Sequence, residues 1–429
     1  MLPFLTAYDP PGTSEGTIDP LGLYQIAEHL AVQLVPAVRE RMLRARFLTC
    51  MVIGALVTEG VDDVTDERDA APYLVWEWLV ILALVRAKGD DSSIWGCPGT
   101  LVARRALDQL GYLDARSYLK TPRIFGIYGV YKRLAMHLGL VDVHLAAGPN
   151  AEGLADAWAK DRGLGGVKGF SALKQQWTDA VQRSMEQKPR RTRTRFQNPD
   201  WELLASFFAP ADAKAKEKRY LRDRLFATTD RGLGALHPIW ELQGGFDDGH
   251  FLEETLHDRL EKREPAYGAL LHAVRSYEAF ARSLHDAFDV LKAEAARPDG
   301  QGFVVTGISN DRDFAKSVEG LHQRFSAAHR ALSEITFAKV SLPNLFSDRF
   351  GVFAEPMDAG TCAIHLCAHH EAVQRGKSAD GKRPWFDRIG ADRIYVRHDY
   401  RAQRVAIRPR RYVHDYRGWP IRRFFKDLS

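Results

Sequence analysis

Residues 265–296 read PAYGALLHAVRSYEAFARSLHDAFDVLKAEAA. Apolar side chains recur in this stretch every three or four residues, at Leu270, Val274, Tyr277, Phe280, Leu284, Phe288 and Leu291. Because an α-helix turns once every 3.6 residues, this spacing predicts one long amphipathic helix with a buried face. After the break Asp299-Gly300-Gln301-Gly302, a further helix is predicted over about 311–337. The two helices could form an antiparallel hairpin that serves as scaffolding or as a partner-binding arm.

Helical spacing also dominates much of the rest of the 429-residue chain. Three earlier stretches are expected to be helical: one that follows Asp19-Pro20 and ends near Pro36, one at 39–57, and a buried one at 73–85. The chain is 45% hydrophobic and 27% charged, which is normal for a globular protein and excludes a wholly disordered or collagen-like chain. We therefore expect a mainly α, multi-domain helical protein.

The expected division of the chain has four parts. They are an N-terminal helical domain, a basic linker, a second helical domain with the long hairpin, and a basic α+β region, at 1–187, 188–198, 199–340 and 341–429. The linker begins Lys188-Pro189-Arg190-Arg191-Thr192-Arg193-Thr194-Arg195 and offers no apolar residue to bury. It is either an arm laid on phosphates or an exposed interdomain loop.

Residues 100–146 have the order of a winged helix-turn-helix. Two helices are expected at 101–110 and 128–138, each ended by a glycine, and a short strand is expected at 140–145. Lys132 and Arg133 lie on the second helix, where such a module would contact DNA. Winged-helix modules also serve protein–protein contacts, so the pattern leaves both uses open.

Positive charge is concentrated toward the C-terminal end of the sequence. Residues 375–429 contain sixteen Lys and Arg against six Asp, a net charge of +10. Since the whole chain carries +5, residues 1–374 carry −5. Such asymmetry is typical of a protein that meets a polyanion with one end. The alternative is a basic face that docks on an acidic partner or on the acidic part of this same chain.

A β-hairpin is predicted within this basic region. Residues 393–400 alternate apolar and polar side chains, and a short turn leads to a second strand at 404–408. The candidate phosphate-binding residues are Arg393, Arg397, Arg404, Arg408, Arg410 and Arg411. Aromatic residues are interleaved with them, at Tyr395, Tyr400, Tyr412, Tyr416 and Trp419, and this combination suits phosphate contact with base stacking. In the competing interpretation the arginines pair with neighbouring aspartates.

The stretch from Cys362 to His370 is the most chemistry-like cluster. On a helix, Cys362, His365 and His369 would share one narrow face, and on a strand His365, Cys367 and His369 would do so. Either arrangement offers three ligands of the kind that zinc takes. In the alternative interpretation the histidines satisfy local hydrogen bonds. We therefore expect no cofactor unless zinc occupies this cluster.

Other classes of function are excluded or left without support. The sequence contains no Gly-x-x-x-x-Gly-Lys-Ser/Thr motif of a P-loop ATPase and no Gly-x-Ser-x-Gly motif of a hydrolase. The apolar stretches are too short to cross a bilayer, and the N-terminus lacks the features of a signal peptide. Four cysteines are too few for a disulfide scaffold, so we expect a cytoplasmic protein with no membrane partner.

Two stretches carry a resemblance to known proteins. Asp19-Pro20-Leu21-Gly22-Leu23, then Leu30-Ala31, Leu34, Pro36 and Arg44-Ala45-Arg46-Phe47, resemble the opening of bacterial proteins encoded in antiphage defence islands. The tail from Ala368-His369-His370 through Pro384-Trp385-Phe386 is similar to their C-terminal part. Pro36 is followed by Ala37-Val38 where the commoner form has a turn of Gly with Ser or Thr. The resemblance implies an accessory subunit that acts beside an ATPase or a nuclease in defence against foreign DNA, and it supplies no catalytic residues.

Three hypotheses of function remain. The leading one is a nucleic-acid-binding accessory subunit of a bacterial defence system that contacts phosphates through the basic C-terminal region, with DNA as the expected nucleic acid. The second is a metal-dependent nuclease that uses the cluster from Cys362 to His370. The third is a non-enzymatic scaffold whose helical hairpin recruits partners.

Overall fold

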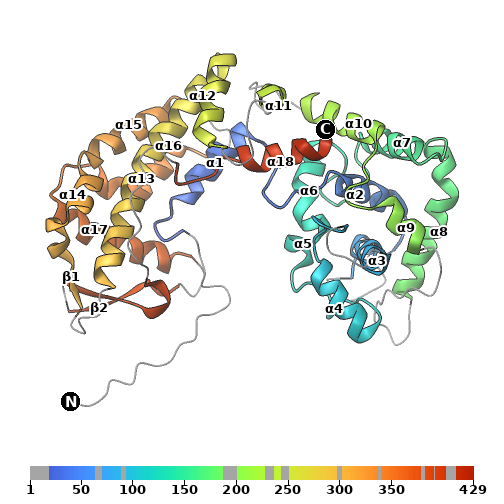
Figure 1. Ribbon diagram of the computed structural model, residues 1–429, viewed down its shortest axis with the longest axis horizontal. Coiled ribbons are helices and arrows are strands. Elements are labelled where there is room, and N and C mark those ends of the chain that lie inside the picture. The colour runs from blue at the N-terminus through green and yellow to red at the C-terminus, as the bar shows by residue number, and fades with distance from the viewer. Residues whose placement is uncertain are drawn as a thin grey trace, which may run out of the picture. The chain divides into compact units, whose positions relative to one another are not determined.

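The computed structural model describes eleven stretches of the chain: 19–62, 70–87, 93–186, 201–227, 236–242, 251–296, 302–336, 340–377, 382–390, 392–401 and 412–429. They form two compact units. Unit 1 combines residues up to Leu34 with Leu252–Tyr416, and unit 2 combines Val35–Phe251 with Arg417–Ser429. Both units are built mainly of helices, so the prediction of a mainly α protein is confirmed (Figure 1).

Unit 1 contains seven of the described α-helices and a small sheet. The helices are α1 (Tyr24–Leu34), α12 (Glu253–Arg263), α13 (Gly268–Ala295), α14 (Arg312–Val318), α15 (Leu321–Ser333), α16 (Leu342–Phe350) and α17 (Ala359–Arg375). The strands are β1 (Phe303–Val304), β2 (Phe386–Ile389) and β3 (Arg393–Val396). Several of these helices pack directly against α13, among them α1, α14, α15 and α17. The longest helix is thus the centre of the unit.

The helix α13 covers almost the whole stretch quoted above. Its apolar side chains are buried, and the Phe280 ring lies 5.0 Å from Phe346 and 5.9 Å from Phe325, between ring centroids. The predicted second helix at 311–337 is wrong in its continuity, because the chain breaks at Glu319 and Gly320. Gly320 has φ of 66°, a left-handed backbone that suits glycine, so α14 ends there and α15 begins. Both pack against α13, as the expected hairpin requires.

The sheet of unit 1 is antiparallel, with strand order β1-β3-β2. Phe386 pairs with Val396 and Phe303 with Ile394. The side chains of Phe386, Ile394 and Val396 are buried beside Phe288 of α13. The predicted strand at 393–400 is wrong at its end, because β3 stops at Val396 and a turn of 3₁₀-helix (His398–Tyr400) follows. The expected partner at 404–408 lies outside the described residues.

Unit 2 contains the remaining described helices. They are α2 (Arg46–Val57), α3 (Pro72–Ala87), α4 (Thr100–Leu110), α5 (Pro122–Phe125), α6 (Ile127–His137), α7 (Ala151–Asp161), α8 (Val167–Met185), α9 (Trp201–Phe207), α10 (Ala215–Ala227), α11 (His237–Leu242) and α18 (Gly418–Leu428). The apolar helix α3 lies inside the unit and is packed by α2, α4, α6, α8 and α9 (Figure 1). Every residue from 74 to 85 is buried, as the uninterrupted apolar pattern predicts.

One charged residue lies within that buried stretch of α3. The Glu77 carboxylate accepts a hydrogen bond from the Tyr118 hydroxyl at 2.7 Å and another from the Tyr128 backbone N–H at 3.1 Å. Tyr128 belongs to the first turn of α6, so the carboxylate lies at the positive end of that helix. Burial still outweighs these contacts and raises the pKa of Glu77 to about 7.

The expected winged helix is only partly present. Helices α4 and α6 form where the sequence predicts them, but residues 140–145 form no strand, and one isolated bridge joins Val141 to Ala147. The reason is local, because the Asp142 side chain accepts hydrogen bonds from the backbone N–H groups of His144 and Ala146 and curls the chain into a turn. The prediction of a wing strand is therefore wrong.

The two units do not follow the domain boundaries expected from the sequence. The linker at 188–198 lies outside the described residues, yet the helices that follow it pack on helices that precede it, α9 on α3 and α10 on α7. The basic region at 341–429 is shared between the units, because its last helix, α18, belongs to unit 2. Among the described helices, none has both the length and the apolar character that crossing a lipid bilayer requires.

Candidate nucleic-acid interface

The helix α18 has one apolar and one basic face. Ile421, Phe424, Phe425 and Leu428 are buried on the apolar face. On the other face Arg422 is also buried, Arg423 is half-buried and Lys426 is exposed. Phe425 packs against Trp240 of α11, with ring centroids 5.0 Å apart. The apolar face fixes the helix to unit 2 and thereby sets the direction of its basic side chains.

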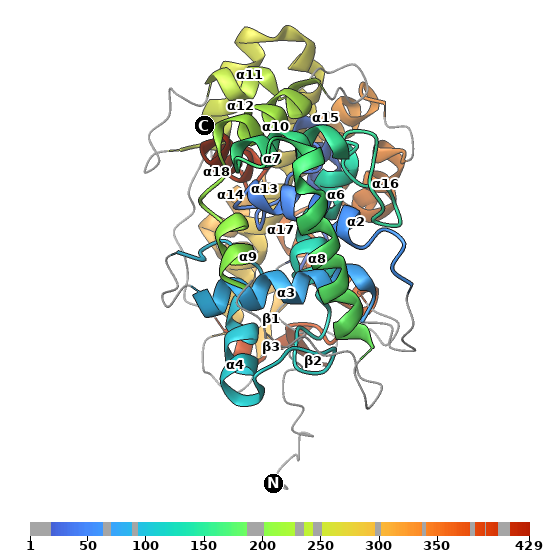
Figure 2. The same cartoon turned by 90° about the vertical axis from the view of Figure 1, so that its right-hand side faces the viewer.

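These basic side chains line a pocket in unit 2 with a cavity volume of about 420 Å³. Helix α10 lies beside α18 (Figure 2) and contributes Lys218. The complete lining consists of Arg44, Trp95, Ala211, Lys218, Trp419, Arg422, Arg423, Lys426 and Asp427. Five of these residues are Lys or Arg and one is acidic. A cavity with this excess of positive charge attracts anions.

An ion pair fixes one wall of the pocket. Arg44 Nη1 lies 2.6 Å from Asp427 Oδ1, and the second carboxylate oxygen of Asp427 accepts a hydrogen bond from the Ala45 backbone N–H at 2.7 Å. Arg44 Nε also donates to the Trp95 carbonyl oxygen at 3.3 Å. These contacts tie α18 to the start of α2. Asp427, the acidic residue of the described lining, is therefore already neutralised by Arg44.

Two tryptophans complete the pocket. Trp95 is 48% exposed, and the guanidinium carbons of Arg44 and Arg423 lie 4.9 Å and 5.6 Å from the centroid of its ring. The guanidinium of Arg422 stacks between Trp419 and Phe251 at 5.9 Å and 5.4 Å from their centroids. An exposed indole with cations around it offers both a stacking surface and charge.

Two cations of the pocket are not neutralised by any of the described residues. In the part of the chain that the structure describes, neither the Lys218 ammonium nor the Arg423 guanidinium forms an ion pair with a carboxylate. Both side chains are half-buried, and cations that line a concave surface without a carboxylate partner keep their charge available for a ligand. This property distinguishes Lys218 and Arg423 from Arg44, whose charge is used by Asp427.

A buried ion pair joins α2 and α10, next to residues of the pocket lining. Arg46 Nη1 lies 2.7 Å from Glu217 Oε2, both side chains are fully buried, and the Thr49 hydroxyl donates to the other oxygen of Glu217 at 2.6 Å. Arg44 and Arg46 both belong to the Arg-Ala-Arg-Phe motif of the resemblance, so that motif contributes one residue to the pocket and one to its support.

Two of the six arginines predicted to contact phosphates lie among the described residues, and both are held by their own unit. Arg397 lies 3.3 Å from Asp387 Oδ1, and Arg393 donates to the Gly302 carbonyl oxygen at 3.3 Å. The other four, Arg404, Arg408, Arg410 and Arg411, lie outside the described residues.

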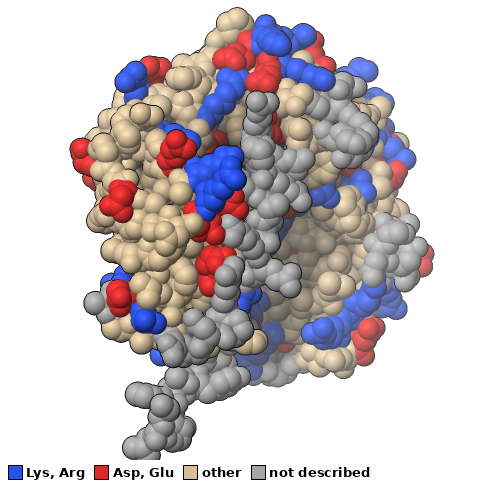
Figure 3. All heavy atoms as spheres, turned by 60° about the vertical axis from the view of Figure 1, so that its left-hand side comes forward, with Lys and Arg blue, Asp and Glu red and all other residues tan. Residues whose placement is uncertain are grey.

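Most of the aromatic residues interleaved with these arginines also have partners within unit 1. Tyr400 stacks on Trp385, Tyr395 lies beneath Arg401, and the buried Tyr416 donates to Glu278 at 2.8 Å. Trp419 alone among them lines the basic pocket. On the face shown in Figure 3, basic and acidic side chains are interspersed, and the described residues there present no continuous basic surface.

Lys132 and Arg133 do not form part of the pocket. Both lie on α6, where the Lys132 ammonium donates to the Val143 carbonyl oxygen at 2.8 Å and Arg133 is exposed. Since no wing strand forms beside them, the two residues remain on the surface of a helix that is otherwise packed against α2 and α5.

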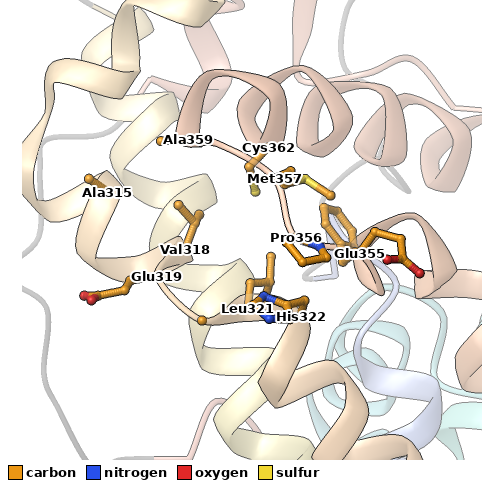
Figure 4. A pocket seen from close by; sticks show the side chains of 12 residues that line it. Ala315, Val318, Glu319, Leu321, His322, Glu355, Pro356, Met357, Ala359 and Cys362 are labelled. Carbon is orange, nitrogen blue, oxygen red and sulfur yellow. The ribbon is translucent and has the colours of Figure 1, made fainter.

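The candidate zinc ligands are not brought together as a site. They lie on α17, and within the described ranges no group of three or more His, Cys, Asp or Glu side chains is placed to hold a metal ion. The Cys362 thiol instead faces a separate, mostly apolar pocket of about 290 Å³, next to Leu321 and Met357 (Figure 4). Burial raises the pKa of Cys362 to about 12, so the thiol stays protonated. His365 is half-buried on the same helix.

The histidines of α17 bind the backbone of the segment before α1. His369 Nε2 lies 2.8 Å from the Leu21 carbonyl oxygen, and His370 Nδ1 donates to the Pro20 carbonyl oxygen at 2.9 Å. His370 Nε2 accepts the Trp385 backbone N–H at 3.0 Å. These contacts agree with the alternative in which the histidines satisfy hydrogen bonds, but the two bonds to Pro20 and Leu21 are long-range and not local as expected. They also connect the two stretches that carried the resemblance.

Most of the pocket residues carry no signal in the sequence that links them to one another. The motif Arg422-Arg423-Phe424-Phe425-Lys426 is the exception, because its spacing is that of an amphipathic basic helix and could have indicated α18. Nothing in the sequence joins Trp95 or Lys218 to that helix. A comparison of the chain with protein-family models, with curated proteins and with solved structures finds no match.

Proposed function

We propose that this protein binds nucleic acid through the pocket formed by α18, α10 and the start of α2. The observation that carries the proposal is the set of five cations around two tryptophans, of which Lys218 and Arg423 have no carboxylate partner among the described residues. Phosphate groups provide the missing negative charge, and bases provide partners for the indoles.

The predicted role in bacterial defence is part of the proposal. Its support is the resemblance of residues 19–47 to defence-island proteins and the position of Arg44 from that stretch in the pocket. An accessory subunit of this kind works in the cytoplasm, beside an ATPase or a nuclease, and would recognise foreign DNA. The four cysteines, all unpaired and buried, are in keeping with a reducing compartment. The gene neighbourhood tests this role, because a defence subunit should be encoded next to an ATPase or a nuclease.

The salt dependence of binding tests the pocket. Each phosphate contact releases counterions, with a slope of roughly −0.7 to −0.9 in log K against log salt. Replacing Lys218, Arg423 and Lys426 together by Ala should therefore weaken binding to DNA and flatten the slope by about 2. The matched control removes three exposed cations of unit 1, Arg312, Lys316 and Arg330. If both triple variants keep the parent's affinity and slope, the pocket is not the binding site.

The basic stretch between β3 and α18 forms a second part of the proposal. Its support is the density of Arg404, Arg408, Arg410 and Arg411 in eight residues, which the few nearby aspartates cannot neutralise. We expect these arginines to be exposed, so replacing all four by Ala should flatten the salt slope further without lowering the melting temperature. A lower melting temperature with an unchanged slope would instead favour docking of this stretch on the acidic part of the chain.

A further inference from the structure

The geometry of the pocket points to a more specific ligand: we infer that it holds a nucleotide of an unpaired strand and that the protein prefers single-stranded nucleic acid to a duplex. This inference rests on the proposed function, since it names the form of nucleic acid that the same pocket binds. It follows from the shape of the site, from the position of Trp95 and from the distribution of charge.

The site is concave, whereas a duplex presents its phosphates on a convex surface. A cavity of about 420 Å³ lies within the range of pockets that enclose small molecules. In a duplex the bases are stacked and paired inside the helix, so they cannot enter such a cavity without being flipped out. A surface for duplex DNA would need only the cations and would gain nothing from indoles within the cavity.

Trp95 is placed to stack with a base. Its ring is 48% exposed even though Arg44 and Arg423 both lie within 6 Å of it. Arg44 is fixed by Asp427, but Arg423 is held by no carboxylate in the described chain, so its long side chain is able to move aside for a base. Aromatic platforms of this kind bind bases with little regard to sequence, since every base has a π-face.

The pocket that Trp95 lines also presents cations from two helices. Lys218 comes from α10 and Arg423 from α18, and both line the same cavity as Trp95. A nucleotide whose base contacts the indole therefore has cations from two helices available for the phosphates on its two sides. This combination of a stacking platform and flanking cations is the usual arrangement of single-strand binding sites.

Fluorescence anisotropy with the full chain tests the inference. The probes are a labelled 12-nucleotide oligo-dT, a 12-base-pair duplex of mixed sequence, and polyphosphate as a competitor that has negative charge and no bases. We expect the single strand to bind at least tenfold more tightly than the duplex. Polyphosphate of equal charge should compete poorly, because it offers nothing to stack on Trp95.

Variants of Trp95 separate stacking from charge. Trp95→Leu keeps an apolar side chain and removes the π-face, so it should weaken single-strand binding about tenfold and duplex binding little. Trp95→Phe should retain most of the affinity. The matched control is Trp201→Leu, because Trp201 also has an arginine, Arg86, over its ring but does not line the pocket. Melting temperatures of all variants verify folding.

The outcomes distinguish this inference from the proposal beneath it. If the Lys218, Arg423 and Lys426 triple variant loses affinity but Trp95→Leu binds single strands as the parent does, the inference is wrong and the proposed function stands. Equal affinity for duplex and single strand, or effective competition by polyphosphate, would overturn it in the same way. If the triple variant binds every probe as the parent does, both are wrong.

Discussion

Acidification should destabilise unit 1 through histidines that are buried in their neutral form. His370 and His257 are both fully buried. Burial lowers the pKa of His370 to about 4 and that of His257 to about 3. The contacts agree with neutrality, because His370 Nε2 accepts the Trp385 backbone N–H and a protonated ring could no longer do so.

The magnitude follows from the difference between folded and unfolded pKa values. A histidine of the unfolded chain titrates near its ordinary pKa of about 6.5. Below that pH the imidazole is therefore protonated in the unfolded state while it stays neutral in the folded state. The stabilisation is therefore complete above about pH 6.5 and is lost as the pH falls toward the folded pKa. At pH 5 each of the two histidines lowers the free energy of unfolding by about 2 kcal/mol.

The assay is urea unfolding of the full chain between pH 7 and pH 5. His257→Phe keeps an aromatic ring against Tyr412 and Tyr416, although it loses the contact between His257 Nδ1 and the Tyr412 hydroxyl at 3.4 Å. His370→Asn keeps a donor for the Pro20 carbonyl oxygen. Each variant should recover about 2 kcal/mol of the stability that the parent loses on acidification. His398→Asn is the control, because its side chain is 91% exposed and should change nothing. If the two buried variants lose as much stability as the parent between pH 7 and pH 5, the reasoning is refuted.

Three further predictions concern stability. The pKa of Glu77 is raised to about 7 from 4.5 in the unfolded chain, so the protonated carboxyl stabilises the fold fully below pH 4.5 and this stabilisation is lost as the pH rises through 7. The free energy of unfolding should therefore fall by about 3 kcal/mol between pH 4 and pH 8, and Glu77→Gln should remove this fall. An unchanged pH profile of the variant would contradict the prediction. Arg46→Met should lower the free energy of chemical unfolding by about 3–5 kcal/mol because it leaves Glu217 buried and unpaired. The double variant with Glu217→Leu should recover much of that loss, and equal losses in both variants would disprove the explanation. Leu284→Asp should destabilise unit 1 by several kcal/mol in a thermal melt followed by circular dichroism, and an unchanged melt would show that this face of α13 is exposed.

The features that the sequence predicts well are those with a local cause. The length of α13 follows from the repeat of apolar residues, and the burial of α3 follows from its uninterrupted apolar run. The predicted strand at 140–145 fails because Leu140 and Val141 are buried next to a turn made by Asp142, so their apolar character reflects packing and not pairing. Short apolar runs carry this ambiguity in general.

The candidate site was not predictable because it depends on long-range packing. Arg44, Trp95, Lys218 and Arg423 are far apart in the sequence and come together only when α18 packs beside α10. The sequence shows that positive charge is concentrated toward the C-terminal end. It does not show that these basic residues are divided between two units. The histidines of α17 were visible as a cluster, but their hydrogen bonds to residues 20–21 were not.

The order of the chain through the two units has a consequence for synthesis. Unit 2 is made of residues 35–251 and 417–429, with most of unit 1 encoded between them. Domains usually fold as they leave the ribosome, beginning from the N-terminal side. Arg422, Arg423 and Lys426 are translated only after residues 252–416. A nascent chain that ends before residue 417 therefore has most of unit 2 but lacks these three basic residues of the pocket. Any binding through this pocket therefore begins only after unit 1 has been synthesised.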